Sequence, residues 1–352
     1  MSGRAAAAET PVRVMLCDDS AVIRGALARM LEADARVRVV ARAADGRQAV
    51  AALARQKVDV AVLDIEMPDL DGLAALPLLL QADPHLRVIM ASTLTTRGAD
   101  IALRALRLGA ADYVPKPSVA AIGDDSFRRE LLAKVLALGA RPPRNAAPAP
   151  TLRRAAPRQA PALLAIGCST GGPQALFSLL PALGARLPVP VVVTQHMPPT
   201  FTRLLAGHLD RLGALPCTEA EDGAALRPGH LYLAPGERHL LVEGAPGRLS
   251  ARLSDGPAEN FCRPAVDPML RSAAAACGGR VLVLMLTGMG QDGLAGTRAV
   301  TEAGGTALAQ DEASSVVWGM PGAVAQAGLC RDVLPLSALG SAARTLLTAA
   351  AA

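Results

Sequence analysis

Three residues of the kind that carry out nucleophilic hydrolysis stand in turn-like segments, each just after an apolar run. Ser169 lies in Ile-Gly-Cys-Ser-Thr-Gly-Gly, His196 in Thr-Gln-His-Met-Pro and Asp292 in Thr-Gly-Met-Gly-Gln-Asp-Gly. In hydrolases of this kind a histidine takes the proton of the serine, and an aspartate orients the histidine and stabilises its charged form. The pattern therefore predicts that Ser169, His196 and Asp292 act together as nucleophile, base and orienting group.

Two of these residues also have an ordinary structural explanation. Ser169 could cap a helix that begins at Pro173, and Asp292 could cap a helix from Gly293 onward, a frequent role for both residue types. Residues 167–171 fit the pattern G-x-S-x-G, which exposes a serine between a strand and a helix. The chain order Ser–His–Asp, however, differs from the Ser–Asp–His order of α/β-hydrolases and argues against that family.

A second set of polar residues ends the apolar runs of the N-terminal part. Asp18, Asp19 and Asp64 would bring three carboxylates to one edge of a sheet, where a hard cation such as Mg²⁺ would neutralise them. Lys116 would supply a fixed positive charge, and Ser92 or Thr93 a hydrogen-bond donor, for a phosphoryl oxygen. This set predicts a site in which Asp64 accepts a phosphoryl group with the help of Mg²⁺.

The elements that must position this acidic site alternate between strand and helix. Strands are expected at 12–17, 37–41, 58–63, 86–91 and 112–115, and a last helix carries the apolar stripe Phe127, Leu131, Val135 and Leu138. Apolar strands separated by helices indicate a parallel sheet covered on both faces. Functional sites in such sheets lie at the carboxyl ends of the strands, which is where the acidic residues fall.

A linker is expected at residues 140–161, which are rich in Arg, Pro and Ala and lack core-forming residues. A second α/β module is expected at 162–349. Its strands are expected at 163–166, 189–193, 231–233, 239–242, 281–286 and 306–309, with helices at 173–180, 200–212, 264–277 and 293–303. The strands at 231–233 and 239–242, on either side of Gly236, form a candidate hairpin.

The net charge of +5 does not indicate a nucleic-acid partner. Five arginines and no acidic residue fall within 141–160, so this segment alone accounts for the excess charge. A nucleic-acid-binding domain would be expected to carry a basic face of its own. The glycines near 167–172 do not spell the dinucleotide-binding pattern G-x-G-x-x-G either.

The cysteines and the apolar segments point to a cytoplasmic protein without direct membrane insertion. The six cysteines show no metal-ligand spacing and are interpreted as reduced thiols; Cys168, beside Ser169, is expected to be a buried thiol. No apolar run is long enough to span a bilayer, and Met1–Thr10 lack the apolar core of a signal peptide.

Several segments in the N-terminal part of the chain match one known family. They are Cys17–Ser20, Leu63–Pro68 with Asp71-Gly72, Ser92 and Gly109–Pro117. On these segments, residues 11–139 resemble the receiver domain of two-component response regulators, a flavodoxin-like doubly wound fold. The resemblance implies that Asp64 is the phospho-acceptor and that Asp18, Asp19 and the backbone carbonyl of Glu66 help to hold Mg²⁺. It further implies a switch formed by Ser92 and Tyr113, together with Lys116, and a cis peptide bond before Pro117.

Several segments in the C-terminal part of the chain match one known family. They are Ile166–Pro173, Gln195–Pro198, Leu233–Gly236, Arg263–Asp267, Leu286–Gly293 and Ala309–Pro321. On these segments, residues 162–349 resemble the catalytic domain of the chemotaxis protein-glutamate methylesterase (CheB) family, expected to have a mainly parallel sheet. The resemblance implies that Ser169 is the nucleophile, His196 the base and then the acid, and Asp292 the orienter, with Thr170 and the backbone of Met289 at the oxyanion.

Together the two resemblances imply an esterase activated by phosphorylation. It would demethylate glutamate methyl esters on chemoreceptors, with release of methanol, and deamidate receptor glutamines, without a cofactor for the esterase step. A chemotaxis histidine kinase would supply the phosphate. The alternatives are a receiver-adaptor without turnover, against which the complete set of Ser169, His196 and Asp292 argues, and a transcriptional regulator, for which no helix-turn-helix is found.

Overall fold

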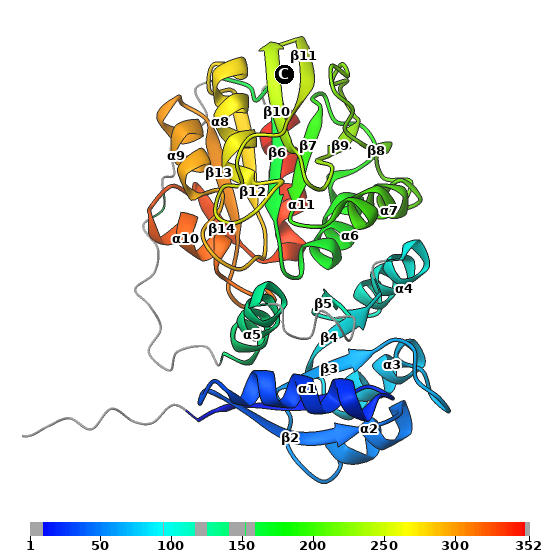
Figure 1. Cartoon of the computed structure of the whole chain (residues 1–352). Coiled ribbons are helices and arrows are strands. Elements are labelled where there is room, and N and C mark those ends of the chain that lie inside the picture. Colours follow the sequence, from blue (N-terminus) through cyan, green and yellow to red (C-terminus); the bar gives the residue numbers. More distant parts are fainter. Residues whose placement is uncertain (1–9, 94, 117–124, 141–151, 153–158, 349–352) are drawn as a thin grey trace, which may run out of the picture. The chain divides into compact units, whose positions relative to one another are not determined.

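The chain folds into two compact units, Met1–Pro143 and Arg144–Ala352. The structure is a computed structural model that describes residues 10–93, 95–116, 125–140, 152 and 159–348 (Figure 1). The expected cis peptide before Pro117 and almost all of the expected linker at 140–161 lie outside the described residues. Each unit contains its own parallel sheet and is described here by itself.

The first unit is built on a five-stranded sheet of order β2-β1-β3-β4-β5, in which all neighbouring strands are parallel. This is the flavodoxin-like doubly wound order, so the expected fold class is confirmed. The elements are β1 Val12–Cys17, α1 Ala21–Glu32, β2 Val37–Ala43, α2 Gly46–Leu53, β3 Val60–Asp64, α3 Gly72–Ala82, β4 Arg87–Ser92, α4 Thr96–Arg107, β5 Asp112–Pro115 and α5 Asp125–Gly139.

Helix starts in the first unit follow from local side-chain chemistry. Ser20, Asp45, Asp71 and Thr95 are N-caps whose side chains accept a hydrogen bond from a backbone N–H in the first turn of α1, α2, α3 and α4. The caps lie within three residues of the ends of β1, β2 and β4, and seven residues after the end of β3. The loop after β1 is therefore short, and Asp64 is itself the last residue of β3, so the acidic residues lie at the sheet edge.

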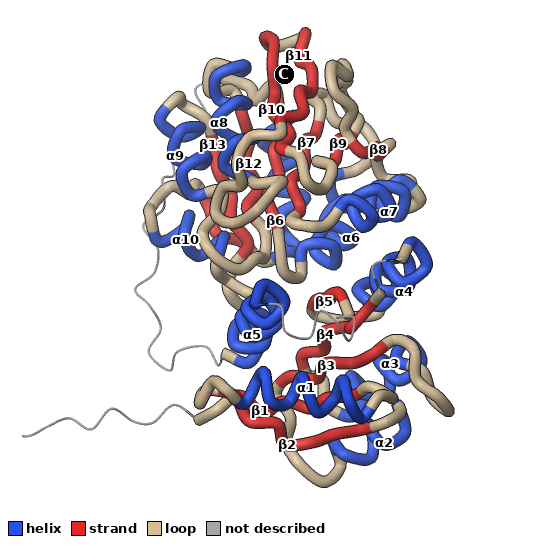
Figure 2. The backbone as a smooth tube through the Cα atoms, in the orientation of Figure 1, coloured by secondary structure: helices blue, strands red, loops and turns tan. Residues whose placement is uncertain are grey.

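The second unit contains a seven-stranded sheet of order β14-β13-β12-β6-β7-β9-β8, again parallel between all neighbours. Figure 2 shows helices on both sides of these strands. The elements are β6 Leu163–Cys168, α6 Gly172–Leu183, β7 Val191–Gln195, α7 Pro199–Asp210, β8 Cys217–Glu219, β9 Leu231–Leu233, β10 His239–Ala245, β11 Arg248–Ser254, α8 Val266–Cys277, β12 Val281–Met285, α9 Leu294–Glu302, β13 Thr306–Gln310, α10 Met320–Gln326, β14 Asp332–Leu334 and α11 Leu336–Thr348.

The prediction that the strands at 231–233 and 239–242 form a hairpin is wrong. β9 pairs in parallel with β7 and β8, whereas β10 pairs with β11 in a separate antiparallel ribbon. Gly236 lies in a turn with Glu237, but this turn leads from β9 into the strand of another sheet. A Cβ on Gly236 would lie 2.2 Å from the backbone nitrogen of Pro199, so this glycine permits close packing against the start of α7. The ribbon turns instead through Pro246 and Gly247, which lie between the paired residues Ala245 and Arg248.

The winding direction of the chain changes at a switch point at the centre of the second sheet, beside β6. From β6 the chain continues to β7 on one side, and it later returns to β12 on the other side. Ligands in open α/β sheets bind at the carboxyl ends of strands where the winding direction changes. Ser169 directly follows β6. Within the described part of the chain, no helix is long and apolar enough to cross a membrane.

Candidate functional sites

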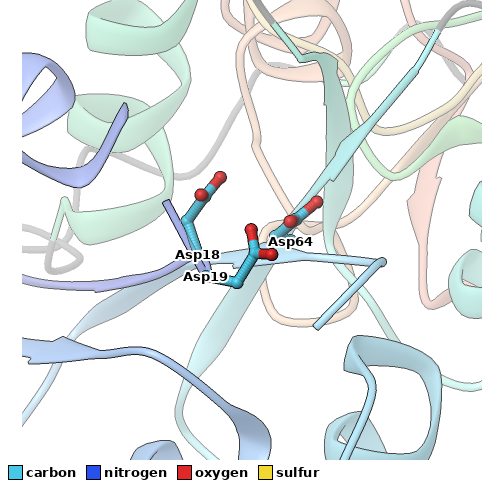
Figure 3. Close-up of side chains that lie close together, drawn as sticks. All are labelled: Asp18, Asp19 and Asp64. Carbon is cyan, nitrogen blue, oxygen red and sulfur yellow. The ribbon is translucent and has the colours of Figure 1, made fainter. Parts of the chain in front are cut away.

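Three carboxylates gather at the carboxyl edge of the first sheet. A carboxylate oxygen of Asp18, one of Asp19 and one of Asp64 lie within 4.8 Å of one another (Figure 3). Asp18 and Asp19 follow β1, and Asp64 ends the neighbouring strand β3. Oxygen ligands at this spacing have the chemistry that Mg²⁺ requires.

Lys116 compensates part of this negative charge. Its Nζ lies 2.6 Å from Asp64 Oδ2 and 3.1 Å from Asp18 Oδ2. Burial raises the pKa of Asp64 to about 6, although the hydrogen bond from Lys116 and one from the backbone of Glu66 act in the opposite direction. The carboxylate of Asp64 is therefore held by one strong donor in a place where its charge is poorly solvated.

The other residues expected around this site differ in exposure. Ser92 ends β4 and is buried, and its Oγ donates to the carbonyl of Thr93. Tyr113 is buried in β5, where Nζ of Lys134 lies 5.1 Å from the centre of its ring. Glu66 is exposed in the loop after β3, so its side chain is not part of the acidic cluster. The geometry places Ser92 near the cluster edge, since β4 is the neighbour of β3.

In the second unit, Ser169 and His196 follow adjacent parallel strands. Cys168 and Gln195 are partners in the register of β6 and β7, so the next residue of each strand reaches the same edge of the sheet. The backbone N–H of His196 also donates to the carbonyl of Cys168. Ser169 is partly exposed and does not cap α6, whose N-cap is Gly171 without a side-chain hydrogen bond.

The neighbouring cysteine does not share the exposed position of Ser169. Cys168 is fully buried, and its Sγ lies 3.8 Å from the carbonyl oxygen of Thr194. Burial raises the pKa of this thiol far above its ordinary value, which keeps the sulfur in the poorly nucleophilic thiol form. The geometry of residue 168 thus fits a small core residue.

His196 binds Asp292 through Nε2, at 2.8 Å from Oδ2. Nδ1 therefore faces the other way, and Cys262 Sγ lies 3.5 Å from it. Among the described residues, Ser169 Oγ has no hydrogen bond to the imidazole; such contacts often tighten only when substrate binds. Burial lowers the pKa of His196, but the bond to Asp292 and the contact with Cys262 together outweigh this and raise the pKa to about 9.

Asp292 accepts hydrogen bonds from five donors. Oδ2 accepts from His196 and from the backbone N–H of Val266, while Oδ1 accepts from the N–H groups of Asp267 and Gly293 and from the amide of Asn260. Val266 and Asp267 begin α8, so Asp292 caps that helix from the loop after β12. Burial alone would raise the pKa of Asp292, but these donors lower it, and the carboxylate stays charged.

The expected oxyanion residues adjoin Ser169 on two sides. Thr170 is buried at the start of the turn into α6, and its carbonyl accepts from Thr287 Oγ1. Met289 follows Gly288, at which a Cβ would lie 3.0 Å from both the Cβ and the backbone nitrogen of Ser169. Only glycine lets the loop after β12 pass so close to the serine, which brings the backbone of the Gly288–Met289 segment to the site.

Three residues in contact with this site were not identified from the sequence. Asn260 and Asp267 surround Asp292, and Cys262 contacts His196. Asp267 lies in a segment that supports the family resemblance, but no pattern in the sequence connects Asn260 with a carboxylate 32 residues away. His239, at the start of β10, binds the carbonyl of Pro257 and the N–H of Ala265 and so anchors the loop that carries Asn260.

Comparisons with known proteins agree with this two-part organisation. Residues 14–124 match the family model of the response regulator receiver domain, and residues 164–343 match that of the CheB methylesterase. A protein-glutamate methylesterase/protein-glutamine glutaminase of Azospirillum brasilense is 54% identical over 98% of this chain and 95% of the relative. One of Caulobacter vibrioides is 52% identical over 94% of this chain and 97% of the relative.

A solved structure resembles the second unit. The crystal structure of the Thermotoga maritima CheB methylesterase catalytic domain is 40% identical, with a TM-score of 0.51, and covers 53% of this chain and 98% of that chain. With the matches to both family models and to relatives of nearly full length, the resemblance inferred from sequence is confirmed: the chain belongs to the CheB methylesterase family and carries an N-terminal response-regulator receiver domain.

Proposed function

We propose that this protein is a phosphorylation-activated serine esterase that hydrolyses methyl esters of glutamate side chains on chemoreceptors and deamidates receptor glutamines. The observation that carries the proposal is the His196–Asp292 bond at 2.8 Å beside Ser169, at the switch point of the second sheet. A buried, charged carboxylate holding a histidine next to a partly exposed serine suits acyl transfer.

In the first half of the reaction Ser169 Oγ attacks the ester carbonyl while Nδ1 of His196 takes its proton. Nε2 is bound to Asp292, so Nδ1 is the nitrogen that can reach the serine, which requires the imidazole to exchange its contact with Cys262 for one with Ser169. The charged imidazolium is stabilised by Asp292 and then gives its proton to the departing methoxide, which leaves as methanol. The result is an acyl-enzyme on Ser169.

In the second half, water attacks the acyl-enzyme and His196 accepts the water proton. The bond between the acyl carbon and Ser169 Oγ then breaks, His196 returns the proton to Oγ, and the glutamate carboxylate is released. The tetrahedral oxyanion of both halves would be bound by the backbone N–H groups of Thr170 and Met289, because these residues adjoin the serine on two sides. With a glutamine substrate the same steps release ammonia in place of methanol. None of these steps uses a cofactor.

In the receiver we propose Asp64 as the phospho-acceptor, with Mg²⁺ held by Asp18, Asp19, Asp64 and the backbone carbonyl of Glu66. Bound Mg²⁺ would neutralise the developing charge on the phosphoryl group. Lys116 would bind a phosphoryl oxygen, and Ser92 and Tyr113 would act as the switch. The cluster of carboxylates within 4.8 Å and the lysine 2.6 Å from Asp64 support this assignment.

We propose that the unphosphorylated receiver restrains the esterase and that phosphorylation of Asp64 releases it. The order of receiver and esterase in one chain supports a regulatory relation between them. The phosphate donor would be a chemotaxis histidine kinase, and the substrate a methyl-accepting chemoreceptor, in keeping with the names of the relatives. Neither role requires nucleic acid or insertion into a membrane, and we propose a cytoplasmic location for the protein.

The nucleophile is tested by release of labelled methanol from methylated receptor membranes. Ser169→Ala should abolish release, and Asp292→Asn should lower kcat by about 10⁴-fold, as loss of the orienting carboxylate does in serine proteases. Ser178→Ala, an exposed serine on α6, is the matched control and should be fully active. Normal turnover of Ser169→Ala together with an inactive Cys168→Ala would identify the thiol as the nucleophile instead.

The pH profile should follow His196, which must be neutral to act as a base. Because its pKa is raised to about 9, kcat/KM should rise with pH and level off only near that value. Asp292→Asn removes the carboxylate that raises the pKa, so the rising limb of the residual activity should move toward lower pH. A profile that is already flat at about pH 7 would mean that His196 keeps its ordinary pKa of 6.5 and would contradict the raised pKa.

The receiver site is tested by labelling with a small phosphodonor such as acetyl phosphate. Asp64 should be labelled only in the presence of Mg²⁺, and Asp64→Asn should not be labelled. Asp69→Asn in the same loop is the matched control, because this exposed residue has φ of 60°, which asparagine tolerates. Equal labelling of Asp64→Asn, or full labelling in excess chelator, would rule out this site.

Regulation is tested by comparing the full chain with a fragment of residues 159–349. The fragment should fold, since its sheet and core are complete, and it should be active without a phosphodonor. The unphosphorylated full chain should be slower by about 10- to 100-fold, an ordinary coupling between two sites. A folded fragment that is no faster than the unphosphorylated full chain would mean that the receiver does not inhibit.

A further inference from the structure

A tight turn over the second site places an asparagine between two buried carboxylates. Glu259 and Cys262 exchange backbone hydrogen bonds of 3.1 and 2.8 Å, and the two residues between them, Asn260 and Phe261, have φ of 52° and 63°. Positive φ at both central residues is the geometry of a type I′ turn, which asparagine accepts readily. The backbone conformation therefore directs residue 260 toward Asp292.

The amide of Asn260 joins the two carboxylates. Its Nδ2 lies 3.0 Å from Asp292 Oδ1 and 3.0 Å from Asp267 Oδ2. Because both neighbours are acceptors, the amide must present its N–H₂ group to them and not its oxygen. One side chain thus uses both of its N–H groups on the buried carboxylates, although the residue itself is exposed.

The two carboxylates also cap each other's helices. Asp292, which precedes α9, accepts from the first N–H groups of α8, and Asp267, in the first turn of α8, accepts from Gly296 N–H in α9 at 2.6 Å. Burial and the nearby charge of Asp292 raise the pKa of Asp267. The two like charges repel each other, and Asn260 is the side-chain donor that both share.

We propose that Asn260 is a positioning residue for the esterase reaction, which fixes the Asp292 carboxylate so that Oδ2 stays aimed at Nε2 of His196. This inference rests on the proposed function of the Ser169 site. Without the amide, repulsion from Asp267 would favour rotation of Asp292 away from the position in which it holds the imidazole. Asn260 touches no reacting atom, so it acts on the rate through Asp292 and His196.

The loop around Asn260 has enough other anchors to keep its shape when the amide is removed. His239 binds the carbonyl of Pro257 and the N–H of Ala265, and Arg271 forms a two-pronged ion pair with Glu259 at 2.5 and 3.0 Å. Glycine also accepts the positive φ of residue 260. Asn260→Gly therefore removes the amide while leaving the turn in place.

The test compares Asn260→Gly with Phe261→Gly in the full chain, activated by acetyl phosphate and assayed by methanol release from methylated receptor membranes. Phe261→Gly places the same residue at the other left-handed position of the same turn and leaves Asn260 in place; the Phe261 side chain is fully exposed. Asn260→Gly should lower kcat by about 10- to 100-fold, the effect of losing a hydrogen bond to a charged group. Its KM should stay within about twofold of the parent value, and Phe261→Gly should retain the parent kcat.

A second variant separates positioning from a merely structural role. Asn260→Asp keeps the shape of the side chain but has no donor when its new carboxyl group is ionised, whereas the protonated carboxyl group can donate to Asp292 again. The kcat of Asn260→Asp relative to Asn260→Gly should therefore rise as the pH is lowered, a change that loss of folding would not produce. The charged or titratable groups that face this position are Glu259 and Cys262 of the turn, Asp267 and Arg271 of α8, His196 after β7, and Asp292.

The outcomes distinguish this inference from the proposed function. If Ser169→Ala is inactive and Asn260→Gly keeps the parent kcat, the serine site stands and the positioning role of Asn260 is refuted. The role is also refuted if Phe261→Gly loses as much kcat as Asn260→Gly, because the turn and not the amide would then matter. If Ser169→Ala retains full activity, the proposed site itself fails, whatever Asn260 does.

Discussion

The carboxylate of Asp292 is the point on which the architecture of the second unit depends. It accepts from a histidine, an asparagine and three backbone N–H groups, and these donors come from the end of β7, the turn at residues 259–262, α8 and the loop after β12. Burying a charged group costs free energy unless the group is fully hydrogen-bonded. All five donors are therefore needed to keep the buried carboxylate of Asp292 charged at low cost. The same requirement fixes the orientation of His196.

Both units have carboxylates at the ends of parallel strands, but the surroundings shift the pKa of these carboxylates in opposite directions. In the second unit, donors on both oxygens lower the pKa of Asp292, which stabilises the charge and suits a group that must hold another residue without reacting. In the first unit, burial raises the pKa of Asp64 to about 6 with Lys116 as its main compensation. A poorly stabilised carboxylate next to a lysine suits a group that is to form a bond.

The sequence predicts the parallel sheets because their strands are apolar runs between helices. It also predicts that Asp18, Asp64, Ser169 and His196 lie at strand ends, because each stands where an apolar run gives way to turn residues. The β10–β11 ribbon is not predicted, although Arg248–Ser254 alternates polar and apolar residues as a half-buried strand does. Asn260 and Cys262 are missed because their partners are 32 and 66 residues away, and only the folded chain brings them together.

The side chains of Ser169 and Asp292 differ in how many hydrogen bonds they make to the rest of the fold, and this difference affects which of them can be lost by mutation. Within the described residues, the side chain of Ser169 caps no helix and has no hydrogen-bond partner, so its hydroxyl can be lost without structural damage. Loss of Asp292 would leave the buried first N–H groups of α8 without their acceptor and would remove one of the two carboxylates that the amide of Asn260 binds. In a related chain that has lost esterase activity, we therefore expect the serine to be replaced first. The aspartate should be retained, because it still caps α8.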